Sequence, residues 1–114
     1  MDLTVKSLPN ITLVSVEAAR IDAAVAIQFK EKMRGISETA AERVVLDLST
    51  VTFLDSSGLG AVVAVMKHLD PDATLELASL NPAVAKVFRL TRLDSVFTIH
   101  ADVETALGGV AQAG

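Results

Sequence analysis

Two adjacent serines stand where a strand-like run changes into a helical one. Residues 44–48 (VVLDL) are typical of a strand, residues 59–66 (LGAVVAVM) are typical of an apolar helix, and Asp55, Ser56 and Ser57 lie between them. The first turn of a helix has unpaired backbone N–H groups and the positive end of the helix dipole. A serine at such a junction can cap the helix, bind an anion or carry a phosphate.

A catalytic role for these serines lacks support in the sequence. A nucleophilic serine needs a base within hydrogen-bond reach, whereas His68 follows Ser56 by twelve positions, or about 18 Å along a helix. His100 is expected at a strand end or in the turn that follows. Neither histidine has the spacing of a metal ligand, and the chain has no Gly-x-Ser-x-Gly or phosphate-binding glycine motif. We therefore expect no enzyme, no catalytic residue, no metal site and no cofactor.

The composition indicates one soluble domain over residues 1–114. Hydrophobic residues make up 51% of the chain and aromatic residues only 4%, without Trp or Tyr, so the core must be aliphatic. A net charge of −4 and a pI of about 5.0 argue against a nucleic-acid partner. Cysteine is absent, and no uncharged apolar run approaches the roughly 18 residues that cross a bilayer. These features predict a cytoplasmic protein without a membrane partner.

Periodicity and turn residues predict an α/β fold with one mixed sheet. Strands are expected at 3–5, 11–16, 43–48, 74–77 and 96–99, and helices at 22–36, 57–69, from 82 onwards and at 102–107. Asp22 and Asn81 are expected to cap the first and third helices. The resulting order is β-β-α-β-α-β-α-β-α, an N-terminal hairpin followed by alternating helices and strands with right-handed crossovers.

The helix after the serines is apolar on all sides. Helical spacing assigns four residues to the core face: Leu59, Val62, Val63 and Met66. Three others fall towards the opposite side: Ala61, Ala64 and Val65. Either a neighbouring helix covers that side, or it forms an exposed apolar patch beside the serines, as a partner-binding face does.

The residues around the serines resemble the phosphorylation motif of bacterial anti-sigma-factor antagonists, members of the STAS (sulfate transporter and anti-sigma-factor antagonist) family. Residues 55–60 (DSSGLG), after the run 45–54 (VLDLSTVTFL), are similar to that motif and its preceding strand. Ile21 and Asp22 resemble the family's loop before the first helix. The C-terminal pattern is similar as well, at 81–84 (NPAV), Val87, Phe88, Leu93, Phe97, Ile99 and Ala106.

This resemblance implies a STAS fold and a partner-switching cycle. A serine kinase that is itself the anti-sigma factor would phosphorylate Ser56. The unphosphorylated chain would bind this kinase and free a sigma factor for transcription, and a PP2C-type phosphatase would reset the cycle. Asp22, Asp55 and Ser57 have an alternative role as helix caps. The residues expected to contact the partner or orient the hydroxyl are Asp22, Asp55, Ser57, Gly58, Leu59, Ala61 and Val65.

The chain departs from the family pattern at two positions. Ala19 replaces the usual glycine three residues before Asp22, which bears on the shape of that loop. Arg92 stands where many members have a glycine before Leu93. Together with Lys86 and Arg89, it forms a basic row. This row is either a solvated face or a partner contact.

Two other functions compete with the phosphorylation switch. A STAS scaffold or transport-accessory subunit would dock a partner without a phosphorylation cycle, but the intact pair of Asp55 and Ser56 favours the switch. A small enzyme or nucleotide-binding domain would need a base, a metal site or a glycine loop that the sequence lacks.

Overall fold

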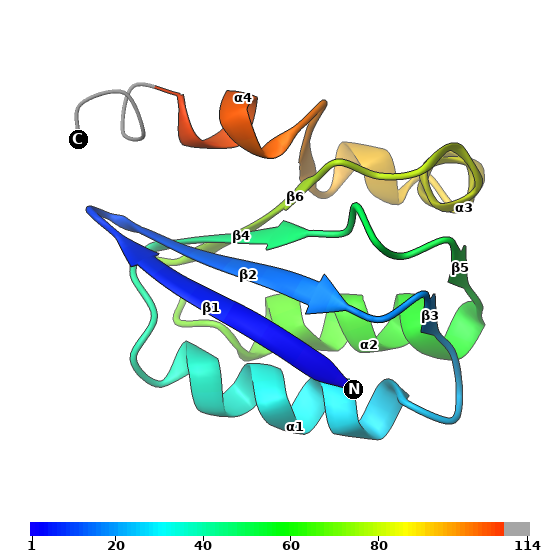
Figure 1. The fold of residues 1–114 in the computed structure, drawn as a ribbon, viewed down its shortest axis with the longest axis horizontal. Coiled ribbons are helices and arrows are strands. Elements are labelled where there is room, and N and C mark those ends of the chain that lie inside the picture. Colours follow the sequence, from blue (N-terminus) through cyan, green and yellow to red (C-terminus); the bar gives the residue numbers. More distant parts are fainter. Residues whose placement is uncertain (109–114) are drawn as a thin grey trace.

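A mixed five-stranded sheet organises the described part of the chain, residues 1–108 of a computed structural model (Figure 1). The strands are β1 (Asp2–Leu8), β2 (Ile11–Glu17), β3 (Arg20–Ile21), β4 (Arg43–Asp47), β5 (Phe53–Leu54), β6 (Thr74–Ala78) and β7 (Thr98–His100). The helices are α1 (Ala26–Ser37), α2 (Ser56–His68), α3 (Pro82–Leu90) and α4 (Val103–Leu107), with a 3-10 turn, η1 (Leu93–Ser95).

The strand order confirms the expected α/β fold. In the large sheet the order is β1-β2-β4-β6-β7; β1 and β2 pair antiparallel and every later pair is parallel. The hairpin closes over Pro9 and Asn10, where Asn10 takes a positive φ of 64°, as a tight two-residue turn requires. The parallel strands are joined through helices, since parallel neighbours need a crossover.

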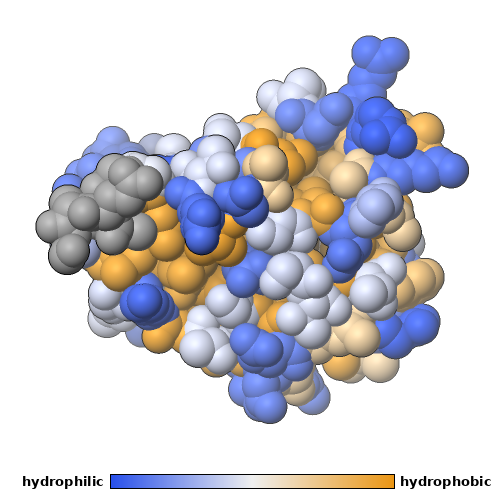
Figure 2. Space-filling view, turned by 45° about the horizontal axis from the view of Figure 1, so that its top comes forward, coloured by the Kyte–Doolittle hydropathy of each residue, from blue (hydrophilic) through white to orange (hydrophobic). Residues whose placement is uncertain are grey.

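Alternation along each strand divides the core into two clusters. Val44 and Leu46 of β4 belong to the larger cluster, which includes residues of α1 and α2, and Figure 1 shows these two helices side by side on one face of the sheet. Val45 points the other way, into a smaller cluster with Ala106 and Leu107 of α4. Figure 2 views the molecule from the side of α4, where apolar side chains gather beside that helix.

Two short strands were not expected from the sequence. β3 and β5 pair parallel in a separate two-stranded sheet, with Arg20 opposite Phe53 and Ile21 opposite Leu54. Two residues are too few to show an alternating pattern. This small sheet joins the loop before α1 to the loop before α2, and it therefore positions the serines.

The start of the first helix was also predicted wrongly. α1 begins at Ala26 rather than Asp22, and its N-cap residue is Val25. The Asp22 carbonyl accepts hydrogen bonds from the N–H groups of Val25 and Ala26 at 3.1 and 2.9 Å, so Asp22 begins a turn that precedes the helix. By contrast, Asp102 caps α4 as expected, accepting from the Thr105 N–H at 2.7 Å.

Candidate functional site

The serines lie at a junction that β3 and β5 hold together. β5 ends at Leu54 and α2 begins at Ser56, with Asp55 between them. The Asp55 N–H donates to the Ile21 carbonyl at 3.4 Å, which continues the parallel pairing of β3 with β5 by one residue. As a result, the loop that contains Asp22 lies beside the residue that precedes Ser56.

Asp55 caps α2 and also ties the helix to the loop after β3. Its carboxylate oxygen Oδ1 accepts from the Gly58 N–H at 2.9 Å. The second oxygen, Oδ2, accepts from the Ala23 N–H at 3.2 Å, and the Asp55 carbonyl accepts from the Leu59 N–H at 2.9 Å. One carboxylate thus fixes both the start of α2 and the loop before α1.

Ser56 and Ser57 are the first two residues of α2, and both are exposed. Because Asp55 supplies the cap, the capping role considered for Ser57 is wrong. Ser56 is thus on the surface, as a residue modified by another enzyme must be. A phosphate on it is compatible with the fold, because the dipole of a helix N-terminus tolerates an anion.

Gly58 is buried where α2 meets β3. A Cβ atom added at this position would overlap the Ile21 carbonyl oxygen. Gly58 therefore permits a close approach between the helix and the strand, and its expected contact with a partner is wrong, since a buried glycine offers no surface. Leu59, the next residue, is half-buried at the border of the larger core cluster.

The side of α2 that holds Ala61 and Val65 is buried rather than exposed, and α1 packs against this helix. Ala61 and Val65 are only 2% and 4% exposed, and Val65 lies in the crevice between α2 and the α1 residues Met33 and Arg34. The expectation that Ala61 and Val65 contact a partner is therefore wrong. An entirely apolar helix gives no periodic signal that separates a face covered by a sheet from one covered by a helix.

Asp22 and Arg20 form an ion pair beside this junction. The Asp22 oxygen Oδ1 accepts from the Ala24 N–H at 3.1 Å, and Oδ2 accepts from Arg20 Nε at 3.2 Å. The Arg20 guanidinium carbon also lies 4.2 Å from the centroid of the Phe53 ring, a cation–π distance. Arg20 and Phe53 were missed in the sequence, because a contact between paired two-residue strands leaves no periodic signal.

Hydrogen bonds also hold the two segments that lead into the junction, the one before β3 and the one before β5. The Ala19 carbonyl accepts from the N–H groups of Thr52 and Phe53 at 2.8 and 3.2 Å. Ala19 has no positive φ, so alanine fits the loop without strain. Asn81, expected as a capping side chain, instead donates to the carbonyls of Ser49 and Val51 at 2.9 and 2.6 Å, and so braces the segment before β5.

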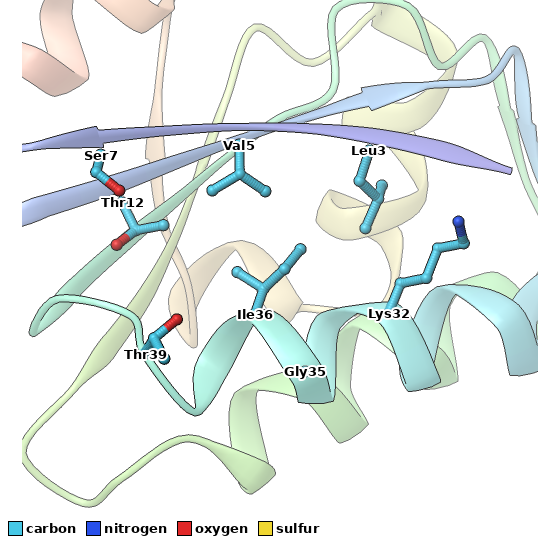
Figure 3. Close-up of a pocket in the computed structure, with 8 residues that line it drawn as sticks. All are labelled: Leu3, Val5, Ser7, Thr12, Lys32, Gly35, Ile36 and Thr39. Atoms are coloured by element: carbon cyan, nitrogen blue, oxygen red, sulfur yellow. The ribbon is translucent and has the colours of Figure 1, made fainter.

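Elsewhere the surface holds an open groove of about 490 Å³ between β1 and α1 (Figure 3). Leu3 and Val5 point from β1 towards Ile36 of α1, and Lys32 lies at one end of the groove. The hydroxyl of Thr12 already accepts from the Ala41 N–H at 2.9 Å. With one titratable residue in its lining, this groove has no set of groups that could act together in a reaction.

A polar cluster lies on the face of the sheet that carries α4. Glu76 is 7% exposed; it accepts from Arg43 Nε and Nη2 at 2.7 Å each and contacts His100 Nε2 at 2.7 Å. The hydrogen bonds from Arg43 lower the pKa of Glu76 to about 2. Arg43 also donates to the Ala106 carbonyl at 2.9 Å, so the cluster anchors α4 to the sheet.

Within residues 1–108, no group of three or more His, Asp or Glu side chains is arranged to hold a metal ion. The helices of this part of the chain are too short or too polar to span a bilayer. His68 is the last residue of α2, at the opposite end from Ser56, and His100 is engaged with Glu76.

Comparison with known proteins identifies the fold family. The family model described as STAS domain matches residues 2–106. The chain belongs to the STAS domain family. BtrV from Bordetella bronchiseptica, provisionally named an anti-sigma factor antagonist, is 28% identical over 107 residues, which are 93% of this chain and 91% of BtrV.

Solved structures of STAS proteins superpose on nearly the whole chain. An anti-sigma factor antagonist from Mycobacterium paratuberculosis is 26% identical, with a TM-score of 0.85 over 96% of this chain and 93% of that one. The anti-sigma factor antagonist SpoIIAA, in its unphosphorylated form, is 23% identical, with a TM-score of 0.75 over 97% of each chain. SpoIIAA of Bacillus is also known in a phosphorylated form. The resemblance found in the sequence is thereby confirmed.

Proposed function

We propose that this STAS protein is an anti-sigma factor antagonist that binds an anti-sigma factor kinase and leaves it when Ser56 is phosphorylated. The proposal depends above all on one observation, the exposed Ser56 hydroxyl at the start of α2, directly after a capping aspartate. The names of BtrV, the mycobacterial protein and SpoIIAA support the same role. The protein itself has no catalytic part in this cycle, and it acts in the bacterial cytoplasm, where ATP is available.

The switch is a phosphoryl transfer from ATP. The Ser56 Oγ attacks the γ-phosphorus, the bond to the β–γ bridging oxygen breaks, ADP leaves, and the hydroxyl proton passes to a base on the kinase. A PP2C-type phosphatase then cleaves the new O–P bond with water and releases inorganic phosphate. Both steps need an accessible Ser56, which the exposed start of α2 provides.

Charge explains how phosphorylation would weaken the complex. A phosphoserine carries about −1.5 to −2 charge at neutral pH, and here it would stand next to the carboxylate of Asp55 and near that of Asp22. The fold tolerates the anion at a helix N-terminus, while the contact surface becomes more negative and bulkier. A loss of about 1.4 kcal/mol in binding already lowers the affinity tenfold.

The contact surface consists of the exposed and half-buried residues around Ser56. We assign to it Asp22, Ser57 and the exposed edge of Leu59. Asp55 acts mainly as a positioning residue, because both of its carboxylate oxygens are engaged within the protein. Gly58, Ala61 and Val65 are buried and support this surface from beneath.

Alanine variants of the two serines test the acceptor. The chain is incubated with ATP and the candidate kinases from its own genome, and the product is mapped by mass spectrometry. Ser57→Ala should take up phosphate as the parent does, whereas Ser56→Ala should take up none and still bind the kinase. Phosphate incorporated by Ser56→Ala, or found mainly on Ser57, would rule out the assignment.

A charged variant tests the electrostatic part of the switch. Ser56→Asp should fold normally and bind the kinase at least about tenfold more weakly than the parent in calorimetry. Ser56→Asn is the matched control, of nearly equal size without the charge, and should bind close to the parent. Equal affinity of Ser56→Asp and Ser56→Asn would show that charge at this junction does not control binding.

A further inference from the structure

Arg20 is a cation placed among the acidic groups of the serine junction. Its side chain is 60% exposed, and it reaches Asp22 through Nε at 3.2 Å while the guanidinium stacks on the Phe53 ring at 4.2 Å. Among the salt bridges within residues 1–108, this is the one at the junction; the others join Glu76 to Arg43 and His100. The proposed function gives Arg20 no role.

The backbone donors of the junction are already engaged by Asp55. Its two carboxylate oxygens accept from the N–H groups of Gly58 and Ala23, and its carbonyl accepts from that of Leu59. A phosphate on Ser56 would therefore share the helix end with a carboxylate rather than enter an empty anion site. A cationic side chain is what this site needs to offset the added charge.

Arg20 has the chemistry and the position to provide that cation. A guanidinium has five N–H donors in a planar fork and prefers phosphate to a single carboxylate oxygen as a bidentate partner. The bond to Asp22 uses Nε, so that bond does not occupy the Nη groups. The pairing of β3 with β5 sets Arg20 opposite Phe53, three positions before Ser56.

We propose that Arg20 is the counter-ion of phosphorylated Ser56, and that it leaves Asp22 and the Phe53 ring when the phosphate is present. This inference depends on Ser56 being the phosphorylated residue, and it adds a second change to the switch. Besides the new charge, the exchange uncovers the ring of Phe53, which is 40% exposed already, and frees the Asp22 carboxylate. The partner then meets a surface altered at three residues rather than one.

The test uses a chain with phosphoserine encoded at position 56, so that no kinase is required. The second pKa of the phosphate is measured by phosphorus NMR. In free phosphoserine this pKa is about 6. With Arg20 present this pKa should be about 0.5–1 unit lower than in the Arg20→Gln protein, because a nearby cation favours the dianion. Arg89→Gln, which removes an exposed arginine from α3, is the control and should match the parent.

A second measurement follows the exchange itself. In the unmodified chain, the stacked Phe53 ring should shift the side-chain proton resonances of Arg20 upfield, and encoded phosphoserine should abolish this shift. The inference is overturned if Arg20→Gln leaves the phosphate pKa unchanged, or if the upfield shift persists in the phosphoprotein. Neither measurement involves a kinase. If the chain bound no anti-sigma factor, the proposed function would be contradicted, but the result on Arg20 would still hold.

Discussion

Gly58 and Ile21 are in direct backbone contact: a side chain at Gly58 would overlap the Ile21 carbonyl oxygen. The same carbonyl accepts the N–H of Asp55 at 3.4 Å. The N-terminus of α2 therefore lies as close to β3 as a polypeptide backbone allows. This contact permits the Asp55 carboxylate to reach the Ala23 N–H, and so it determines the geometry of the junction in front of Ser56.

Gly58→Ala should destabilise the protein by about 1–3 kcal/mol, because the added methyl group forces α2 away from β3. Gly60→Ala is the matched control in the same helix: a Cβ there has no atom within 4 Å, so alanine should stabilise by up to about 1 kcal/mol through helix propensity. Urea denaturation of both variants measures the difference. Similar stabilities for the two variants would mean that the Gly58 contact is not tight in solution.

Asp55→Ala should cost about 1–2 kcal/mol of stability, because the variant loses a helix cap and the bond to the Ala23 N–H. Amide hydrogen exchange at Ala23 should become faster in this variant. Asp102→Ala removes a cap that contacts only its own helix; it should cost less and leave exchange at Ala23 unchanged. Unaltered exchange at Ala23 in Asp55→Ala would refute the bridging role of Asp55.

Arg92→Gly should stabilise the protein by up to about 1 kcal/mol. Arg92 has a φ of 62° in the left-handed region, which costs a residue with a Cβ roughly 1–2 kcal/mol and costs glycine little. Arg89→Gly, within α3, should instead destabilise by about 1 kcal/mol. Thermal unfolding checks both variants. A lower melting temperature for Arg92→Gly than for the parent would show that the left-handed backbone of Arg92 is not strained.

Elements with a clear period could be predicted from the sequence, and elements held by distant contacts could not. The hairpin and the central strand β4 show alternation or continuous apolar runs, and they lie where expected. β3 and β5 exist because Arg20 and Ile21 find partners more than thirty residues away. No pattern within two residues can reveal such a pairing.

The site was predictable in its chemistry and less so in its geometry. The types and order of Asp55 and Ser56 indicated a cap beside a serine, and in the structure Asp55 caps α2 and Ser56 is exposed. The assignment of Ala61 and Val65 to the partner-contact surface failed because α2 is apolar on all sides. The sequence of such a helix does not reveal which side is buried. The position of Arg20 beside Asp22 and Phe53 could be found only from the three-dimensional structure.

Glu76 gives the protein a stability that acid should remove. Arg43 holds the pKa of Glu76 at about 2, below the ordinary value of 4.5. The folded state therefore binds the Glu76 proton less readily than the unfolded chain does, so this contribution is complete above about pH 5 and is lost as the pH falls towards 2. The free energy of unfolding, measured by urea denaturation from pH 7 to pH 2, should fall across this window.

Glu76→Gln isolates the contribution of this carboxylate. At pH 7 the variant should be less stable than the parent by about 2–3 kcal/mol, because Arg43 loses its charged partner beneath α4. Between pH 5 and 2 its stability should fall less steeply than that of the parent, since one titrating group with a lowered pKa is gone. Glu31→Gln, which changes an exposed carboxylate on α1, should keep the parent's steeper fall. Parallel pH profiles for the parent and Glu76→Gln would show that Arg43 does not stabilise the charged form of Glu76.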